Sequence, residues 1–343
     1  MRLAAELSAR GHRAVLGAFA EPLRREAEQG GFAAVRLPAK PRLLAGVLAI
    51  ARACRAHSID LVNAHSLHTT ALAGAARKLR LVRAPVVSTV HNVQDRRNDR
   101  RAAWVLRHFA DQVIFVSRYE RERLAESSGQ PAVGHVIYSG VDRPRPGAVE
   151  PFDLEALHGV PPEARVIGYV GRLSPEKAVG DAIAALPRLP DDVVLCIVGE
   201  GPEEGALRAE ARRRGLEKRV VFAGFSRDVA RYLSAFVLIV LPSRNESLPV
   251  VLREAGAIGL PVVAADVGGV REVVVPRETG LLYESGDVDA LVRAIRVVLD
   301  DPSRAASMGV AGRERIAQLF DVKAWIDETE ALFARIARAP EGK

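Results

Sequence analysis

A polar loop between two apolar runs carries residue types that bind sugars and phosphates. In PSRNESLPVVLREAGAIGLPVV, from Pro242, a helix is expected to begin near Leu248 or Pro249, because proline suits the first helical turn. Glu246 then precedes the helix, and Glu254 lies about two turns along it. The amides of the first turn would cradle phosphate or sugar oxygens. An acidic residue before a helix is also a common cap, so Glu246 is informative mainly through its neighbours.

A second candidate segment, YVGRLSPEKAVGDAI, places two cations after a buried strand that ends at Gly171. Arg172 follows the strand directly, and Lys177 stands five residues later near the start of a helix. Two cations beside a helix N-terminus suit a diphosphate, whose negative charge grows as it departs from a reacting carbon. The alternative reading is a pair of solvated surface cations. The position of the loop at the carboxyl edge of a sheet favours the diphosphate.

The elements that must position these loops alternate along the whole chain. Short β-branched runs alternate with Ala/Leu/Arg-rich helical runs, a pattern that predicts parallel sheets flanked by helices. Strands are expected in IDLVNAH, APVVSTVHN, DQVIFVS, GHVIYSGVD, RVIGYVGRLS, DVVLCIVGEG, RVVFAGF, FVLIVLPSRNES and LPVVAADVGG. The proline-rich RPRPGAVEP breaks the alternation. It separates a first domain, residues 1–145, from a second, residues 155–320, and a final helical segment, residues 321–343, contains core residues Trp325 and Phe333.

The composition limits the classes of protein to which the chain can belong. With 48% hydrophobic residues in 343, each domain can bury a core. No run approaches the roughly 20 apolar residues that span a bilayer, and no signal peptide is evident, so a cytoplasmic location is expected. Cys54 and Cys196 each stand in an apolar run and are expected to be buried free thiols.

Charge is distributed unevenly between the two halves. Residues 1–150 carry a net charge of +11 and the remainder −4. The basic half suits an anionic partner, such as an acidic glycan or the inner face of a membrane, or else reflects solvated arginine-rich faces. An aromatic content of 5% argues against nucleic acid.

The motifs together resemble the retaining GT-B glycosyltransferases of family 4. The resemblance runs from Leu3 to about Phe320 and rests on GRLSPEK, VGEGP, FAGF, LPSRNESLPVVLREA and GLPVVAADVGGVREVV. It implies an α/β fold of two Rossmann-like domains whose parallel sheets face each other across a cleft. It also implies transfer of a hexose from a UDP- or GDP-sugar to a glycan or lipid-linked acceptor, in cell-surface polysaccharide or lipopolysaccharide synthesis.

The same resemblance assigns roles to particular residues. In the donor domain, Arg172 and Lys177 would bind the diphosphate, Glu254 the ribose hydroxyls and Glu246 the transferred sugar. The remaining donor-binding residues would contact sugar, phosphate or base: Ser247, Leu248, Pro249, Gly224 and Phe225.

Three residues of the first half end predicted strands. His91 matches the family histidine that faces the donor sugar from across the cleft, whereas His65 and Ser117 would line the acceptor side. A histidine at a strand end is otherwise often structural. The family needs no metal or other cofactor, and the chain has neither an Asp-x-Asp motif nor a metal-ligand spacing. The resemblance further implies retention of anomeric configuration, by acceptor attack on the face from which the diphosphate departs.

The sequence departs from the family pattern at its start. Met1 falls inside the helix that normally follows the first strand and its glycine-rich loop. Two explanations remain open, a true start codon upstream, which we favour, or a degenerate protein that folds poorly. Leu248 also replaces a more usual aromatic residue, and EKAVG stands where a lysine followed by a glycine is common.

Other functions remain as alternatives. A nucleotide-sugar 2-epimerase would share the fold but need further carboxylates and histidines in the cleft. A truncated chain could bind a nucleotide sugar without turnover. A NAD-dependent oxidoreductase is disfavoured, because GEGPEE has Glu204 where a dinucleotide-binding motif needs its third glycine.

Overall fold

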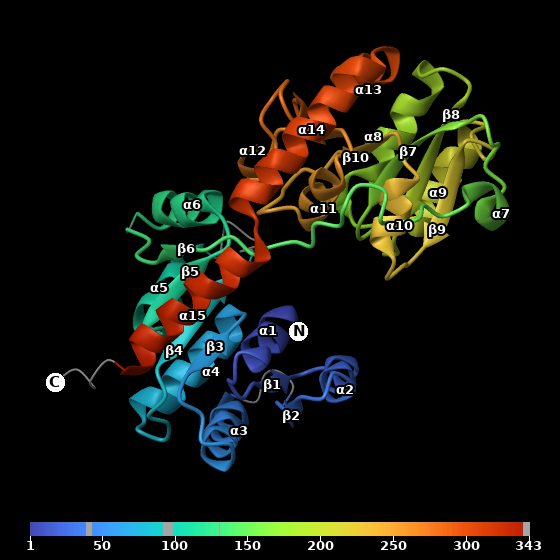
Figure 1. Cartoon of the computed structure of the whole chain (residues 1–343). Helices are drawn as coiled ribbons and strands as arrows, with labels where there is room; N and C mark the ends of the chain where they lie inside the picture. Colours follow the sequence, from blue (N-terminus) through green and yellow to red (C-terminus); the bar gives the residue numbers. More distant parts are fainter. Residues whose placement is uncertain (39–42, 92–98, 130, 339–343) are drawn as a thin grey trace. The chain divides into compact units, whose positions relative to one another are not determined.

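The computed structural model describes residues 1–38, 43–91, 99–129 and 131–338, which form two compact units (Figure 1). The first unit combines Met1–Ser139 with Val322–Lys343, and the second is Gly140–Asp321. Each unit is built on parallel strands, as the alternation of strand and helix predicts.

The second unit contains a six-stranded parallel sheet of order β12-β11-β10-β7-β8-β9. Strand β7, the first of the six along the chain, lies inside the sheet, with two strands on one side and three on the other. This is the doubly wound arrangement. After β7 the chain crosses over to β8, on one side of the β7–β10 pair, and after β10 it crosses over to β11, on the other side. The loops that follow β7 and β10 therefore flank the switch point, where the strand order changes direction. The strands are β7 (Arg165–Val170), β8 (Val193–Val198), β9 (Val220–Gly224), β10 (Leu238–Leu241), β11 (Val262–Ala265) and β12 (Gly280–Tyr283).

Every residue of β8, β10 and β11 is buried, which explains their uninterrupted aliphatic sequences. The helical segments of this unit are α7 (Leu154–His158), η2 (Pro175–Lys177), α8 (Val179–Ala185), η3 (Leu186–Arg188), α9 (Glu204–Arg213), α10 (Val229–Ser234), α11 (Val250–Ile258), α12 (Val270–Val273), α13 (Val288–Asp300) and α14 (Pro302–Leu319). Helices α11 and α14 pack closely through glycines: a Cβ on Gly309 would lie 2.1 Å from the carbonyl oxygen of Gly259.

The first unit contains a four-stranded parallel sheet of order β3-β4-β5-β6. Its strands are β3 (Val62–Ala64), β4 (Val86–Val90), β5 (Gln112–Phe115) and β6 (His135–Val136), and its helices are α3 (Leu43–Ala56), α4 (Leu67–Lys78), α5 (Asp99–Phe109), α6 (Arg118–Ser128) and α15 (Val322–Arg338). Val87 and Ile114 pack with Leu332 of α15, together with the partly buried Trp325 and Phe333. The opposite face packs on α5 and α6. Helices therefore cover both faces of this sheet.

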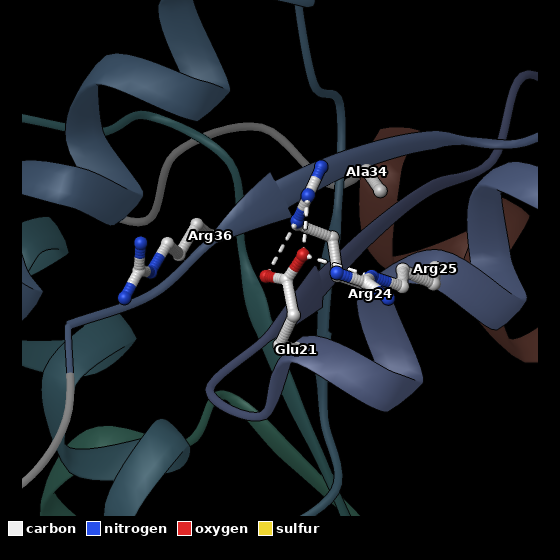
Figure 2. Close-up of a pocket in the computed structure, with 5 residues that line it drawn as sticks. All are labelled: Glu21, Arg24, Arg25, Ala34 and Arg36. Carbon is white, nitrogen blue, oxygen red and sulfur yellow. Dashed lines mark hydrogen bonds and ion pairs between the residues drawn. The ribbon is translucent and has the colours of Figure 1, made fainter.

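The segment before α3 forms a separate two-stranded parallel sheet. Strands β1 (Val15–Ala18) and β2 (Ala33–Arg36) are joined by α2 (Glu21–Gln29), and none of their residues is fully buried. Within the described residues, β1 pairs with β2 alone and β3 with β4 alone. The strand expected ahead of Met1 stays a prediction. A shallow hollow beside β2 is lined by Glu21, Arg24, Arg25, Ala34 and Arg36, in which Glu21 accepts hydrogen bonds from two arginines (Figure 2).

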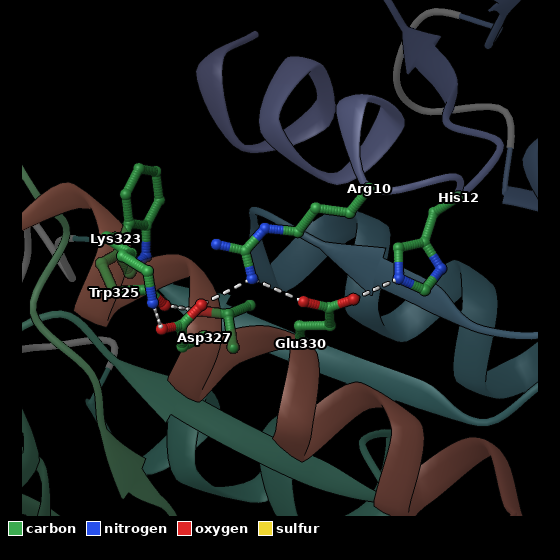
Figure 3. A network of polar contacts seen from close by, with 7 residues as sticks. Arg10, His12, Lys323, Trp325, Asp327 and Glu330 are labelled. Carbon is green, nitrogen blue, oxygen red and sulfur yellow. Dashed lines mark hydrogen bonds and ion pairs between the residues drawn. The ribbon is translucent and has the colours of Figure 1, made fainter.

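A polar network attaches the N-terminal residues to α15 (Figure 3). The Arg10 guanidinium lies 2.6 Å from both Asp327 and Glu330, and His12 Nε2 lies 2.6 Å from the other oxygen of Glu330. The hydrogen bond with His12 has the largest effect and that with Arg10 the next largest, and both lower the pKa of the Glu330 carboxyl. The network fixes the end of α1 (Arg2–Ala9) to the C-terminal helix.

The nine predicted strands correspond to β3 through β11, whereas β1, β2 and β12 were not predicted. Helix α11 begins at Val250, one or two residues later than expected, because Pro249 has an extended ψ of 118° and is the N-cap. Cys196 is buried as expected, but Cys54 is only half-buried at the edge of its cluster. None of the described helices is long and apolar enough to cross a membrane.

Candidate active site

An ion pair joins the two loops at the switch point of the second unit. The Lys177 Nζ donates to Glu246 Oε1 at 2.7 Å, and the Ser243 hydroxyl donates to the same oxygen at 2.7 Å. Lys177 follows β7 and Glu246 follows β10, strands that are hydrogen-bonded neighbours. Glu246 is 7% exposed. A carboxylate so buried needs such partners, and here they orient it.

Arg244 supplies further contacts between the same two loops. Its backbone N–H donates to the Glu176 carbonyl at 2.7 Å. Its guanidinium donates to both oxygens of Asp181, on α8, at 2.7 and 3.1 Å. The Ser174 hydroxyl donates to Glu176 and, with smaller effects from nearby groups, lowers the pKa of that carboxyl. The loop that carries Arg172 and Lys177 is thus fixed to the loop that carries Glu246.

Glycines permit the backbones of adjacent loops to touch. A Cβ on Gly199 would lie 1.9 Å from the carbonyl oxygen of Gly171, and one on Gly269 would lie 1.7 Å from that of Ser247. No side chain fits at either distance. The Gly269 N–H also donates to the Glu246 carbonyl at 3.1 Å. Consequently the loops after β7, β8, β10 and β11 contact one another at the carboxyl edge of the sheet and form one surface, the floor of the candidate site.

Helix α11 begins directly after the β10 loop of this floor. Ser247, Leu248 and Pro249 are buried, and Pro249, the N-cap residue, makes no side-chain hydrogen bond to the helix. Glu254, further along α11, is half-buried, and its desolvation raises the pKa of its carboxyl. The neighbouring Arg253 is buried and stacks over Phe320, and desolvation lowers its pKa to about 10. Helix α11 thus has two kinds of group that could bind a ligand, the backbone amides of its first turn and the Glu254 carboxyl, whose pKa is raised.

Among the predicted donor-binding residues, Arg172 and Phe225 are exposed. The Arg172 carbonyl accepts from the buried Tyr169 hydroxyl at 2.9 Å. Its guanidinium is exposed, and no hydrogen bond or ion pair to another described residue holds it. Burial, aided by the Glu246 carboxylate, raises the pKa of Tyr169. At the end of β9, Gly224 has a φ of +72°, and the Phe225 side chain is 66% exposed.

The first unit brings two predicted residues together and buries the third. His65 Nδ1 lies 2.8 Å from His91 Nε2, at the ends of neighbouring strands. Ser117 is fully buried, and its hydroxyl caps α6 by accepting the Glu120 N–H, so its predicted role in acceptor binding gains no support from this geometry.

Sequence reasoning missed Ser243 and Asn63. Ser243 stands in the quoted loop but has no distinguishing pattern. Asn63 precedes His65 by two residues, and that spacing places both on one side of an extended strand. In the described part of the chain, no cluster of three or more His, Cys, Asp or Glu is placed to hold a metal ion.

Comparisons with known proteins give matches for both units. The second unit matches the family model described as Glycosyl transferases group 1 over residues 153–315, and the first matches Glycosyltransferase Family 4 over residues 1–145. A glycogen synthase of Mycobacterium tuberculosis is 33% identical over 256 residues, 69% of this chain and 60% of that protein. The match thus spans about three fifths of that relative.

Two further relatives carry nucleotide sugars in their names. A GDP-mannose-dependent alpha-(1-6)-phosphatidylinositol monomannoside mannosyltransferase of Mycolicibacterium smegmatis is 36% identical over 218 residues, 60% of this chain and 57% of that protein. Anabaena HepE, solved in complex with UDP-glucose, superposes with a TM-score of 0.84 at 26% identity and covers 94% of this chain and 92% of its own. Since two family models cover both units and the solved structure shares the fold, the chain belongs to the GT-B glycosyltransferases.

Proposed function

We propose that the protein is a retaining glycosyltransferase that moves a hexose from a UDP- or GDP-sugar to a glycan or lipid-linked acceptor. The acceptor class fits cell-surface polysaccharide or lipopolysaccharide synthesis. One observation carries the proposal: Lys177, Glu246 and the N-terminus of α11 come together at the switch point of a doubly wound sheet. Ligands of such sheets bind at that point.

The cations and the helix amides would bind the donor diphosphate. Arg172 is exposed beside the floor, and Lys177 already contacts a carboxylate with one of its three N–H donors. An entering diphosphate would share Lys177 with Glu246, while Ser243 continues to hold the Glu246 carboxylate. Negative charge that develops on the departing diphosphate would then be stabilised by groups already in place.

The remaining predicted residues would bind the rest of the donor. Glu254, half-buried on α11, would accept hydrogen bonds from the ribose hydroxyls, and the base would lie against Gly224 and the exposed Phe225. Glu246 would contact hydroxyls of the transferred sugar. The named donors of the relatives, UDP-glucose for HepE and GDP-mannose for the mannosyltransferase, support a nucleoside diphosphate hexose without deciding between the two bases.

The reaction would proceed on one face of the sugar. The bond between the anomeric carbon and the diphosphate oxygen breaks, the acceptor oxygen bonds to that carbon from the same face, and the acceptor proton passes to the departing diphosphate. No side chain is assigned as a covalent nucleophile. Lys177 and Arg172 would supply the positive charge that a divalent metal supplies elsewhere, so activity should persist in EDTA.

The basic first half suggests peripheral contact with the cytoplasmic face of an anionic membrane. Sedimentation with phosphatidylglycerol vesicles, compared with phosphatidylcholine vesicles, tests that contact. Retention of the protein by both or by neither would argue against it.

The experiment for the transferase itself measures release of UDP and GDP from a panel of nucleotide hexoses, with oligosaccharide and lipid-linked acceptors. Wild type should release one nucleotide in an acceptor-dependent manner, whereas Glu246→Ala and Arg172→Ala should lose at least 100-fold. Arg213→Ala, on the exposed face of α9, removes a cation as a matched control and should keep full activity. Binding of a nucleotide sugar without transfer to any acceptor would support the non-catalytic alternative.

A further inference from the structure

A row of polar side chains lies on one face of two neighbouring strands in the first unit. Strand β3 pairs in parallel with β4, with Asn63 opposite Val87. Because side chains alternate along strands, Asn63, His65, Thr89 and His91 all project to the side on which Val87 packs against α15. The row stands at the carboxyl ends of both strands, beyond the apolar part that α15 covers.

Three hydrogen bonds link the row into a relay. The Thr89 hydroxyl donates to Asn63 Oδ1 at 2.8 Å, and Asn63 Nδ2 lies 3.2 Å from His65 Nε2. His65 Nδ1 then lies 2.8 Å from His91 Nε2, with the two ring planes within 19° of each other.

The direction of the relay determines which nitrogens carry protons. An amide nitrogen only donates, so His65 Nε2 must accept and a neutral His65 must hold its proton on Nδ1. That proton is donated to His91 Nε2, which therefore accepts. A neutral His91 must then hold its own proton on Nδ1.

We propose that Asn63 is a positioning residue that sets the tautomer of His91 through His65, so that His91 is a hydrogen-bond donor at Nδ1. Its effect on sugar transfer rests on the function proposed above, but the tautomer itself does not. Desolvation and the adjacent His91 lower the pKa of the His65 ring to about 4, which favours its neutral form near pH 7, although the residue is exposed. The tautomers assigned above are those of the neutral rings.

A single substitution should reverse the relay. A carboxylate at this position can only accept, so Asn63→Asp should draw the His65 proton to Nε2. His65 Nδ1 would then accept, and the His91 proton would move to Nε2. Gln29→Glu adds the same charge to the exposed end of α2 and provides a matched control.

The test is the tautomer of His91, read from imidazole ¹⁵N shifts by long-range ¹H–¹⁵N correlation of the ¹⁵N-histidine-labelled full chain near pH 7. His91→Gln assigns the signals. Wild type and Gln29→Glu should show His91 protonated on Nδ1, and Asn63→Asp should invert the population. Protonation of His91 on Nε2 in wild type, or an unchanged tautomer in Asn63→Asp, overturns the proposal.

Should Asn63→Asp fail to fold, Asn63→Leu combined with Thr89→Val removes the hydrogen bonds of Asn63 without adding charge and should lower the Nδ1-protonated fraction of His91 below that of wild type. An unchanged fraction in that variant also overturns the proposal. With a transferring enzyme, Asn63→Asp should lower kcat at least tenfold while donor affinity is unchanged, because the donor is bound by the second unit. Absence of any transfer would contradict the proposed function and leave the tautomer result intact.

Discussion

Removal of the Lys177 ammonium tests how strongly the two loops of the donor site depend on each other. Lys177→Met keeps the aliphatic stem but leaves Glu246 with Ser243 as its hydrogen-bond donor. Breaking a fully buried pair costs about 3–5 kcal/mol, whereas an exposed pair contributes about 0–1 kcal/mol. Here the Glu246 side chain is 8% exposed and that of Lys177 is 25%. We therefore expect a loss of about 2 kcal/mol in the free energy of unfolding of the second unit.

A double-mutant cycle separates the pair from other effects. Glu246→Gln removes the stranded charge, so the double variant should recover part of the loss, with a coupling energy of about 1–2 kcal/mol. Urea unfolding followed by far-UV circular dichroism measures both units. Tryptophan fluorescence reports only the first unit, because Trp104 and Trp325 both belong to it. A coupling energy near zero, or an equal shift of the fluorescence transition, would refute the reasoning.

Three further predictions concern the same site. Gly269→Ala places a Cβ 1.7 Å from the Ser247 carbonyl, so it should destabilise the second unit by about 2–4 kcal/mol in thermal unfolding; an unchanged Tm would contradict the close approach. Tyr169→Phe removes the hydrogen bond to the Arg172 carbonyl and should raise the donor KM roughly fivefold, equivalent to about 1 kcal/mol, whereas an unaltered KM would mean that the hydroxyl does not position Arg172. Because the pKa of Glu254 is raised, nucleotide affinity should fall on acidification as pH passes through that raised pKa; titration calorimetry from pH 7 to 4.5 should find this pH dependence weakened in Glu254→Gln, and an identical profile would exclude Glu254.

The strands that stand out most clearly in the sequence are those buried on both faces. Strand β8 reads VVLCIV and is buried at every residue, so its apolar run is unbroken. Strands β1 and β2 are only half-buried and include alanine and glycine, which gives them no comparable pattern. Strand β12 reads GLLY directly after a turn at Thr279 and contains no β-branched residue, so it lacks the β-branched pattern by which strands are recognised.

The candidate site was predictable in its parts but not in its contacts. Glycines, cations and glutamates at strand ends identified the loops that carry Arg172, Lys177 and Glu246. That Lys177 contacts Glu246, 69 residues away, follows from the strand order that places β7 beside β10. No local pattern encodes that order. The same applies to Asn63, whose role depends on the pairing of β3 with β4.

Binding of a nucleoside diphosphate to the loops at the switch point of the second unit can be measured directly. The method is hydrogen–deuterium exchange with mass spectrometry, with and without saturating UDP or GDP. We expect slower exchange in the loop from Gly171 to Ala178 and at the start of α11, with no change in β4 of the first unit. Unchanged exchange in both loops with either nucleotide, or protection confined to the first unit, would contradict it.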